Sequence, residues 1–192
     1  GVNPDTIKIT IGATAITSGI TKTATSDGKG FTCTYTPASA LADGSNTIKV
    51  DVSDYDGNAA AQKSVTFIID NVPPSLSVTA PAYNLITNQA ACTVTGVTND
   101  ATSSPCTVTV KLNNGGAENV TVNADGTFSK ALALVSGSNT ITVVSTDTAG
   151  KSSTVTRTVT LDQVAPVIKS VTITPNPVDA GKTYLISVEG TD

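Results

Sequence analysis

The chain has 192 residues and a formal net charge of −4, with a sequence pI near 4.6. Charged residues make up only 14% of the sequence, and Lys and Arg are not clustered, so we expect no binding to nucleic acid. No apolar run approaches the roughly 20 residues of a membrane helix, and without His a Ser-His-Asp or Cys-His arrangement cannot form. We therefore expect neither membrane insertion nor an enzyme.

The first predicted strand covers residues 4–11, in which Ile7, Ile9 and Ile11 alternate with polar residues. Alternation of this kind is typical of a strand with one face towards a core. Thr and Val, which favour strands, are frequent throughout the chain. A junction at residues 70–74 then ends the first segment, because proline has no backbone donor and interrupts a strand.

A longer series of strands is predicted between residues 73 and 163. Apolar alternation bounded by Gly, Asn, Asp and Pro places these strands at residues 76–79, 92–97, 106–112, 120–122, 128–134, 140–145 and 154–161. A hairpin turn is expected at residues 113–116, since Asn and Gly tolerate positive φ. About seven short strands without helical periodicity predict an all-β sandwich.

A repeat relates the first part of the chain to the second. The pentapeptide GSNTI at residues 44–48 recurs at residues 137–141, an offset of 93. The junction at residues 70–74 recurs at residues 162–166, an offset of 92. A period of this size is that of a whole sandwich domain rather than of a solenoid repeat.

The two ends of the chain match different parts of this repeat. Residues 166–192 are similar to its first two strands, whereas residues 1–72 are similar to the remainder. We therefore expect a domain at residues 1–72 that lacks its first two strands, a complete domain at residues 73–163, and the first two strands of a further domain at residues 164–192. A segment as short as the last one does not bury enough surface to fold alone.

The motif of the repeat is an Asp-Gly turn followed by Phe, the GSNTI pentapeptide, an Asp-x-x-Gly turn and a closing Asp before proline. This pattern resembles bacterial immunoglobulin-like (Big-type) tandem repeat domains of surface and secreted proteins. The resemblance implies an all-β fold of tandem Ig-like antiparallel β-sandwiches, one complete and one split between the two ends of the chain. It also implies an extracellular or cell-surface location. The second copy departs from the family pattern at Lys151, where Asn is usual.

The incomplete domain at residues 1–72 (the head) and the two strands at residues 164–192 (the tail) together predict a mode of assembly. We expect the tail of one molecule to complete the head of the next, giving a head-to-tail fibre of identical copies. The donor positions in the tail are Tyr184, Ile186 and Val188. The acceptor positions in the head are Ile7, Ile9 and Ile11. The alternative is a spacer or stalk segment of a larger bacterial adhesin or secreted polysaccharide-degrading enzyme, in which neighbouring domains are covalently continuous.

Calcium is the ligand that the sequence indicates most sharply. Asp54 and Asp56 lie in a turn and Asp70 lies in the following junction, and hard cations bind several oxygen ligands. The alternative is that these residues only form a hairpin turn. The second copy weakens the calcium hypothesis, because it offers one carboxylate together with Lys151. We assign no metal site and expect no other cofactor.

The three cysteines leave a disulfide open and exclude a zinc site, because neither a Cys-x-x-Cys pair nor a His is present. A bond between Cys92 and Cys106 conflicts with their staggered positions on the predicted strands, and the alternative is two buried thiols. Cys33 is expected in a core. A carbohydrate-binding module is a third hypothesis, with Tyr55 and Tyr83 as binding residues. With no Trp in the chain, we do not expect glycan binding.

Overall fold

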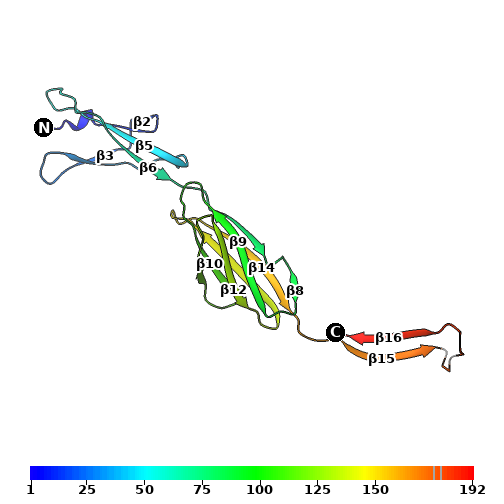
Figure 1. The fold of residues 1–192 in the computed structure, drawn as a ribbon. Helices are drawn as coiled ribbons and strands as arrows, with labels where there is room; N and C mark the ends of the chain where they lie inside the picture. The colour runs from blue at the N-terminus through cyan, green and yellow to red at the C-terminus, as the bar shows by residue number, and fades with distance from the viewer. Residues whose placement is uncertain (175, 178) are drawn as a thin grey trace. The chain divides into compact units, whose positions relative to one another are not determined.

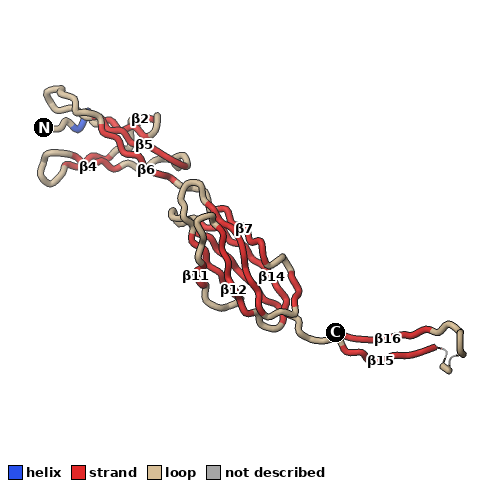
Figure 2. The backbone as a smooth tube through the Cα atoms, in the orientation of Figure 1, coloured by secondary structure: helices blue, strands red, loops and turns tan. Residues whose placement is uncertain are grey.

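A computed structural model of the chain describes residues 1–174, 176–177 and 179–192 (Figures 1 and 2). These residues form β-structure and one short 3-10 helix, η1 (Pro4–Thr6). The strands are β1 (Lys8–Ile11), β2 (Thr14–Ile16), β3 (Thr21–Ala24), β4 (Phe31–Thr34), β5 (Gly44–Asp51), β6 (Lys63–Ile69), β7 (Ser75–Ala80), β8 (Leu85–Thr87), β9 (Ala91–Asn99), β10 (Thr107–Leu112), β11 (Glu118–Val120), β12 (Thr127–Ala133), β13 (Gly137–Thr146), β14 (Ser152–Leu161), β15 (Val167–Thr174) and β16 (Leu185–Thr191). The prediction of an all-β fold is confirmed.

The chain divides into two compact units, which are described separately. The first unit comprises Gly1–Ser75, Asn99–Cys106 and Ser145–Ser153. The second unit comprises Leu76–Thr98, Thr107–Val144 and Thr154–Asp192. Strands β1 to β6 therefore belong to the first unit, together with two loops that border β9 and β13.

Strands β1 to β6 form two small sheets. One is antiparallel with the order β2-β1-β5-β6, and β3 and β4 form the other. The register pairs Ile9 with Val50 and Ile11 with Ile48, which places four apolar side chains on one face of the larger sheet. Residues 1–73 are all described and none of them is buried, so this part of the chain has no closed core.

The strands β7 to β14 form a sandwich with a closed core. One sheet has the order β11-β10-β13-β14-β8 and the other the order β12-β9-β7. Both sheets contribute to a single apolar cluster, in which Val94, Ile141, Val143 and Val159 are fully buried. The predicted strands of this region are all present. The structure adds β8, which pairs in parallel with β14 and is too short, at three residues, to show an alternating pattern.

Gly96 leaves space in this core for the ring of Phe128. Gly96 on β9 pairs with Phe128 on β12, and a Cβ atom at Gly96 would lie 2.4 Å from the Phe128 ring. The ring therefore occupies the space that a side chain on the neighbouring strand would fill. Phe128 is in this way almost completely buried.

The last two strands, β15 and β16, form an antiparallel hairpin (orange to red in Figure 1). Its register pairs Val171 with Val188 and Ile173 with Ile186, and it shifts at a bulge between Ile168 and Ser170. None of the described residues after Leu161 is buried. No helix in the described part of the chain is long and apolar enough to cross a membrane.

Candidate functional site

An apolar groove of about 390 Å³ opens on the first unit. It lies over the face of β1 and β5 that carries the paired apolar residues, and β4 and β6 also contribute to it. The residues that line the groove are Ile9, Ile11, Cys33, Tyr35, Pro37, Leu41, Ile48, Val50 and Phe67. All of them are partly exposed, so the groove is an uncovered apolar surface.

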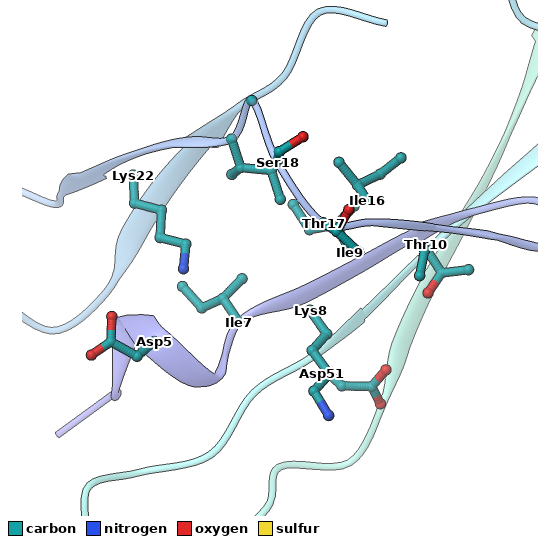
Figure 3. A pocket seen from close by; sticks show the side chains of 13 residues that line it. Asp5, Ile7, Lys8, Ile9, Thr10, Ile16, Thr17, Ser18, Lys22 and Asp51 are labelled. Carbon is teal, nitrogen blue, oxygen red and sulfur yellow. The ribbon is translucent and has the colours of Figure 1, made fainter.

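A second pocket, of about 560 Å³, shares Ile9 with the groove and has a mixed lining (Figure 3). Ile7 lies in this pocket near the Lys22 side chain, whose ammonium donates a hydrogen bond to the Pro4 carbonyl. The predicted acceptor residues are thus divided between two cavities. Ile9 and Ile11 line the groove, whereas Ile7 lines the mixed pocket.

The groove corresponds to the closed core of the complete sandwich. The order β2-β1-β5-β6 matches the order β11-β10-β13-β14, and the repeat aligns Ile48 and Val50 with Ile141 and Val143. Ile141 and Val143 are completely buried, but Ile48 and Val50 remain partly exposed. Among residues 1–73 only β3 and β4 form a second sheet, so strands equivalent to β9 and β7 are absent there.

The hairpin β15–β16 carries an uncovered apolar face. Residues that pair across an antiparallel hairpin share a face, and alternate residues along a strand do so too. One face therefore carries five aliphatic side chains that are 43% to 67% exposed: Ile168, Val171, Ile173, Ile186 and Val188. Apart from Val167 and Leu185 at its ends, the opposite face carries Ser, Thr and Glu. We name the five-residue face the donor face.

The predicted donor residues lie on or beside this face. Ile186 and Val188 belong to the donor face, while Tyr184 precedes β16 and is exposed. The sequence reasoning missed the β15 half of the face, which includes Val171 and Ile173. The alternation of Val171 and Ile173 with Ser and Thr was a usable signal for it, but the bulge at Lys169 interrupts the pattern.

Three carboxylates, from Asp70, Asp100 and Asp147, converge in the first unit, with ligand oxygens that all lie within 4.8 Å of one another. The three residues directly follow β6, β9 and β13. The Ser103 hydroxyl, more than any other group, holds the pKa of Asp70 below its ordinary value, and the charge of Lys151 acts in the same direction. This arrangement of oxygen atoms is able to bind a cation.

The sequence indicated only Asp70 of this group. Asp147 occupies the repeat position of Asp54, at the offset of 93, which is a signal that points to it. Asp100 could not be identified in this way, because only the tertiary fold brings its loop to Asp70. Asp54 and Asp56, the other calcium candidates, are not members of the group in the described part of the chain.

Asp54 uses both of its carboxylate oxygens within its own turn. Oδ1 accepts the backbone N–H groups of Asp56 at 3.0 Å and Asn58 at 2.8 Å, and Oδ2 accepts the Asn58 side-chain amide at 2.9 Å. The Asn58 side chain is the main cause that lowers the pKa of Asp54. The hydrogen bonds of Asp54 thus stabilise the turn.

The three cysteines are free thiols in the structure. Cys92 and Cys106 are buried, and burial raises the pKa of Cys92. Cys33 is half-buried and faces the groove rather than a closed core. Tyr55 and Tyr83, the tyrosines considered for glycan binding, are both exposed.

Comparisons with known proteins find two family models on successive parts of the chain. A model described as a bacterial Ig-like domain matches residues 1–71, and one described as glucodextranase, domain B matches residues 74–163. None of the curated proteins is a significant match.

The solved structures that are similar to the chain include the following two. The fibronectin(III)-like modules of Clostridium thermocellum CbhA are 18% identical, with a TM-score of 0.41 over 84% of this chain and 82% of that one. A tetra-tandem repeat from the extending region of a large adhesion protein is 21% identical, with a TM-score of 0.41 over 98% of this chain and 56% of that one.

Proposed function

We propose that the chain, which matches a bacterial Ig-like domain over residues 1–71 and domain B of glucodextranase over residues 74–163, is a structural module of a surface or secreted bacterial protein. The module contributes length and a site of assembly, and it has no catalytic role of its own. In the finer form of the proposal, the hairpin β15–β16 of one molecule fills the groove of the next. Identical copies then join head to tail by strand complementation, which propagates as a fibre.

The observation that supports this assembly is that the groove lacks covering strands, whereas the hairpin consists of two strands with an uncovered apolar face. The groove has an apolar floor on β1 and β5 but no covering strands equivalent to β9 and β7. The hairpin has two paired strands with an aliphatic face but no side chain that is buried. In the complete sandwich, β9 and β7 bury Val94 and Val78 against the other sheet. The hairpin supplies the corresponding pair of strands.

A free strand edge provides the backbone partner. In the described residues β4 pairs only with β3. Its counterpart β12, which follows the equivalent Asp-Gly turn and contains the equivalent Phe, pairs with β9 from Thr127↔Val97 to Ala133↔Ala91. An unpaired edge is a template for a strand of another chain. We therefore place β16 beside β4, with β15 beyond it, in the order β4-β16-β15 that corresponds to β12-β9-β7.

Burial of the donor face contributes a free energy of the same size as the cost of association. Complete burial of an aliphatic side chain contributes about 1.5–3 kcal/mol, so five such side chains contribute on the order of 10 kcal/mol. Association costs about 4–15 kcal/mol in lost freedom of the two partners. The affinity therefore depends on how completely the five side chains are covered, and single substitutions on this face should be strongly disruptive.

The mass distribution of the chain across a dilution series, measured by analytical ultracentrifugation, tests the assembly. We expect large oligomers at high concentration, and their loss in a version that ends at Val164. Ile186→Lys and Val188→Lys should also abolish them, because each places a charge on the donor face. Ser187→Lys is the matched control, because it adds the same charge to the opposite face of β16.

Two results would contradict the assembly. The first is a monomer at all concentrations, and the second is a set of oligomers that survive both the truncation and Ile186→Lys. Equal disruption by Ser187→Lys and Ile186→Lys would show that the donor face has no special role.

A spacer segment of a longer repeat array is the second candidate. It is favoured by two family-model matches that follow each other with only residues 72 and 73 between them. In this case neighbouring segments of the same polypeptide complete the groove and cover the hairpin. The isolated chain then remains monomeric in the dilution series, whereas a polypeptide that includes the adjacent repeats covers the groove.

A further inference from the structure

In the complete sandwich, an aromatic ring packed over a glycine fixes the position of β9 against β12. Phe128 pairs directly with Gly96, and a Cβ atom at Gly96 would lie 2.4 Å from both the Phe128 ring and the Ser77 carbonyl oxygen. Any side chain at this position would therefore displace the ring. A slip of β9 by two residues would place Val94 or Thr98 under the ring, so the pair allows a single register.

Strand β4 begins with the equivalent phenylalanine, Phe31. In both copies an Asp-Gly turn precedes the ring, and the residue directly before Phe accepts a backbone N–H across that turn. Thr25 donates to Gly30 at 2.9 Å in the first copy, and Asn123 donates to Thr127 at 2.8 Å in the second. Alternation along β4 places the Phe31 ring on the side that lines the groove, where it remains partly exposed.

Strand β16 carries the equivalent glycine, Gly190. It is the sixth residue of β16, as Gly96 is of β9, and ten residues separate β15 from β16 as they separate β7 from β9. The residues that lead to the glycine are similar, CTVTG at residues 92–96 and ISVEG at residues 186–190. Gly190 lies on the donor-face side of β16. Among the described residues, a Cβ atom there would approach only the Val167 carbonyl, at 3.3 Å from its oxygen, so the space above the glycine is open.

We propose that Phe31 of one molecule packs over Gly190 of the next, and that this contact sets the register in which the hairpin enters the groove. The contact rests on the proposed head-to-tail assembly and specifies how the two partners meet. Antiparallel pairing continued from it places Cys33 opposite Val188. A hairpin with a side chain at the position of Gly190 would meet the ring, so the contact also selects the partner.

The buried residues of β9 support this register. Val94 and Cys92, which lie two and four residues before the glycine of β9, are both buried in the sandwich. The residues at the same spacing on β16 are Val188 and Ile186, and both belong to the donor face. The register that seats Gly190 under the ring therefore also directs the donor face into the groove.

Other registers fail for physical reasons. A slip of two residues would place either Val188 or Asp192 under the Phe31 ring. The valine would occupy the space of the ring, and the aspartate would bury a charge without a partner. A slip of one residue would turn the donor face to solvent. Gly190 is therefore the one residue of β16 that accepts the ring.

A disulfide to the native Cys33 reports the register directly. Residues directly opposite on antiparallel strands have Cα atoms about 4.5–5.5 Å apart, which suits a disulfide, whereas diagonal neighbours lie about 7–8 Å apart. After mild oxidation of the assembled chain, Val188→Cys should therefore form disulfide-linked multimers at least about tenfold faster than Ile186→Cys. Electrophoresis without reductant measures both rates. Adding Cys33→Ser should abolish the multimers, since the other two cysteines are buried.

Gly190→Val tests the contact itself. The added side chain competes with the ring for space, and association in the dilution series should weaken by at least about tenfold, as expected for a misfit of this size in a packed core. Thr191→Val is the matched control, because it places the same side chain on the opposite face of β16 and should leave association unchanged. Adding Phe31→Ala to Gly190→Val should restore part of the lost affinity, which loss of the hairpin itself would not allow.

Three results would overturn this register while leaving the assembly in place. They are equal rates for Ile186→Cys and Val188→Cys, oligomers in which neither cysteine reaches Cys33, and equal assembly of Gly190→Val and Thr191→Val. An unchanged chain that stays monomeric at all concentrations would instead overturn the assembly, and the contact with it. The two failures are thus distinguishable.

Discussion

Asn139 explains why the pentapeptide GSNTI occurs twice. This asparagine is fully buried, and its amide donates to the carbonyls of Val135 at 2.7 Å and Gly137 at 3.0 Å. Its Oδ1 atom accepts the Val135 N–H at 3.0 Å. Gly137 adopts a positive φ of 86°, which glycine tolerates better than other residues. The motif is therefore a structural device that closes the loop before β13.

The first copy uses the same device in a more exposed setting. Asn46 donates to the carbonyls of Ala42 at 2.8 Å and Gly44 at 3.1 Å, but it is partly exposed. A repeated motif of this kind indicates common architecture rather than a common ligand. It is informative about the fold and silent about binding.

We expect Asn139→Ala to lower the free energy of unfolding by about 2–3 kcal/mol, because it removes a fully buried side chain together with its hydrogen bonds to Val135 and Gly137. Asn46→Ala should cost less, since water can replace the lost hydrogen bonds. Urea denaturation of the two variants provides the comparison. Equal losses in both copies would argue that burial does not control the contribution of the motif.

At the scale of elements, the sequence predicts the position of a strand where apolar and polar residues alternate along it and turn residues bound it. The strands β7 and β9 to β14 lie within three residues of their predicted positions, because their inward side chains are apolar and their turns contain Gly, Asn, Asp or Pro. Strand β8 escaped prediction, since its three residues depend on parallel pairing with β14. The three-carboxylate group escaped it for a similar reason, as three loops distant in sequence meet only in the fold.

The edge of β4 offers a test at the same scale. We expect the amide hydrogens of Phe31–Thr34 that point away from β3 to exchange rapidly in a version that ends at Val164. In the assembled chain they should exchange slowly, because β16 would accept and donate hydrogen bonds along this edge. Residue-resolved hydrogen exchange by NMR is the measurement. The amides of β12, which already pair with β9, are the internal control and should not change.

At the scale of the whole molecule, the chain combines a part with a closed core and a part without one. The sandwich buries a continuous apolar cluster, whereas residues 1–73 contain no buried side chain. Stability is distributed unevenly when apolar burial is uneven. In the proposed assembly, the part with the open groove is therefore the one whose stability depends on a partner.

This difference predicts two thermal transitions with different responses to protein concentration. The lower transition should rise with concentration, because binding to the folded state stabilises it by mass action. A tenfold increase in protein concentration stabilises the folded state by about 1.4 kcal/mol when binding is saturated. This should raise the temperature of the lower transition by roughly 5–10 °C. The upper transition, from the sandwich, should stay constant. Calorimetric scans would contradict this prediction if the lower transition does not change with protein concentration. They would also contradict it if the lower transition changes equally in the version that ends at Val164.

One feature of the groove makes the number of growing ends measurable. Cys33 lines the groove and is the one cysteine of the chain that is not buried, so a thiol reagent reaches it only while the groove is open. A head-to-tail fibre of the proposed kind has a single open groove, however many copies it contains. The fraction of chains that react rapidly is then the reciprocal of the mean number of copies in a fibre. Alkylation of that one thiol also acts as a stopper, because a modified groove no longer admits the next hairpin.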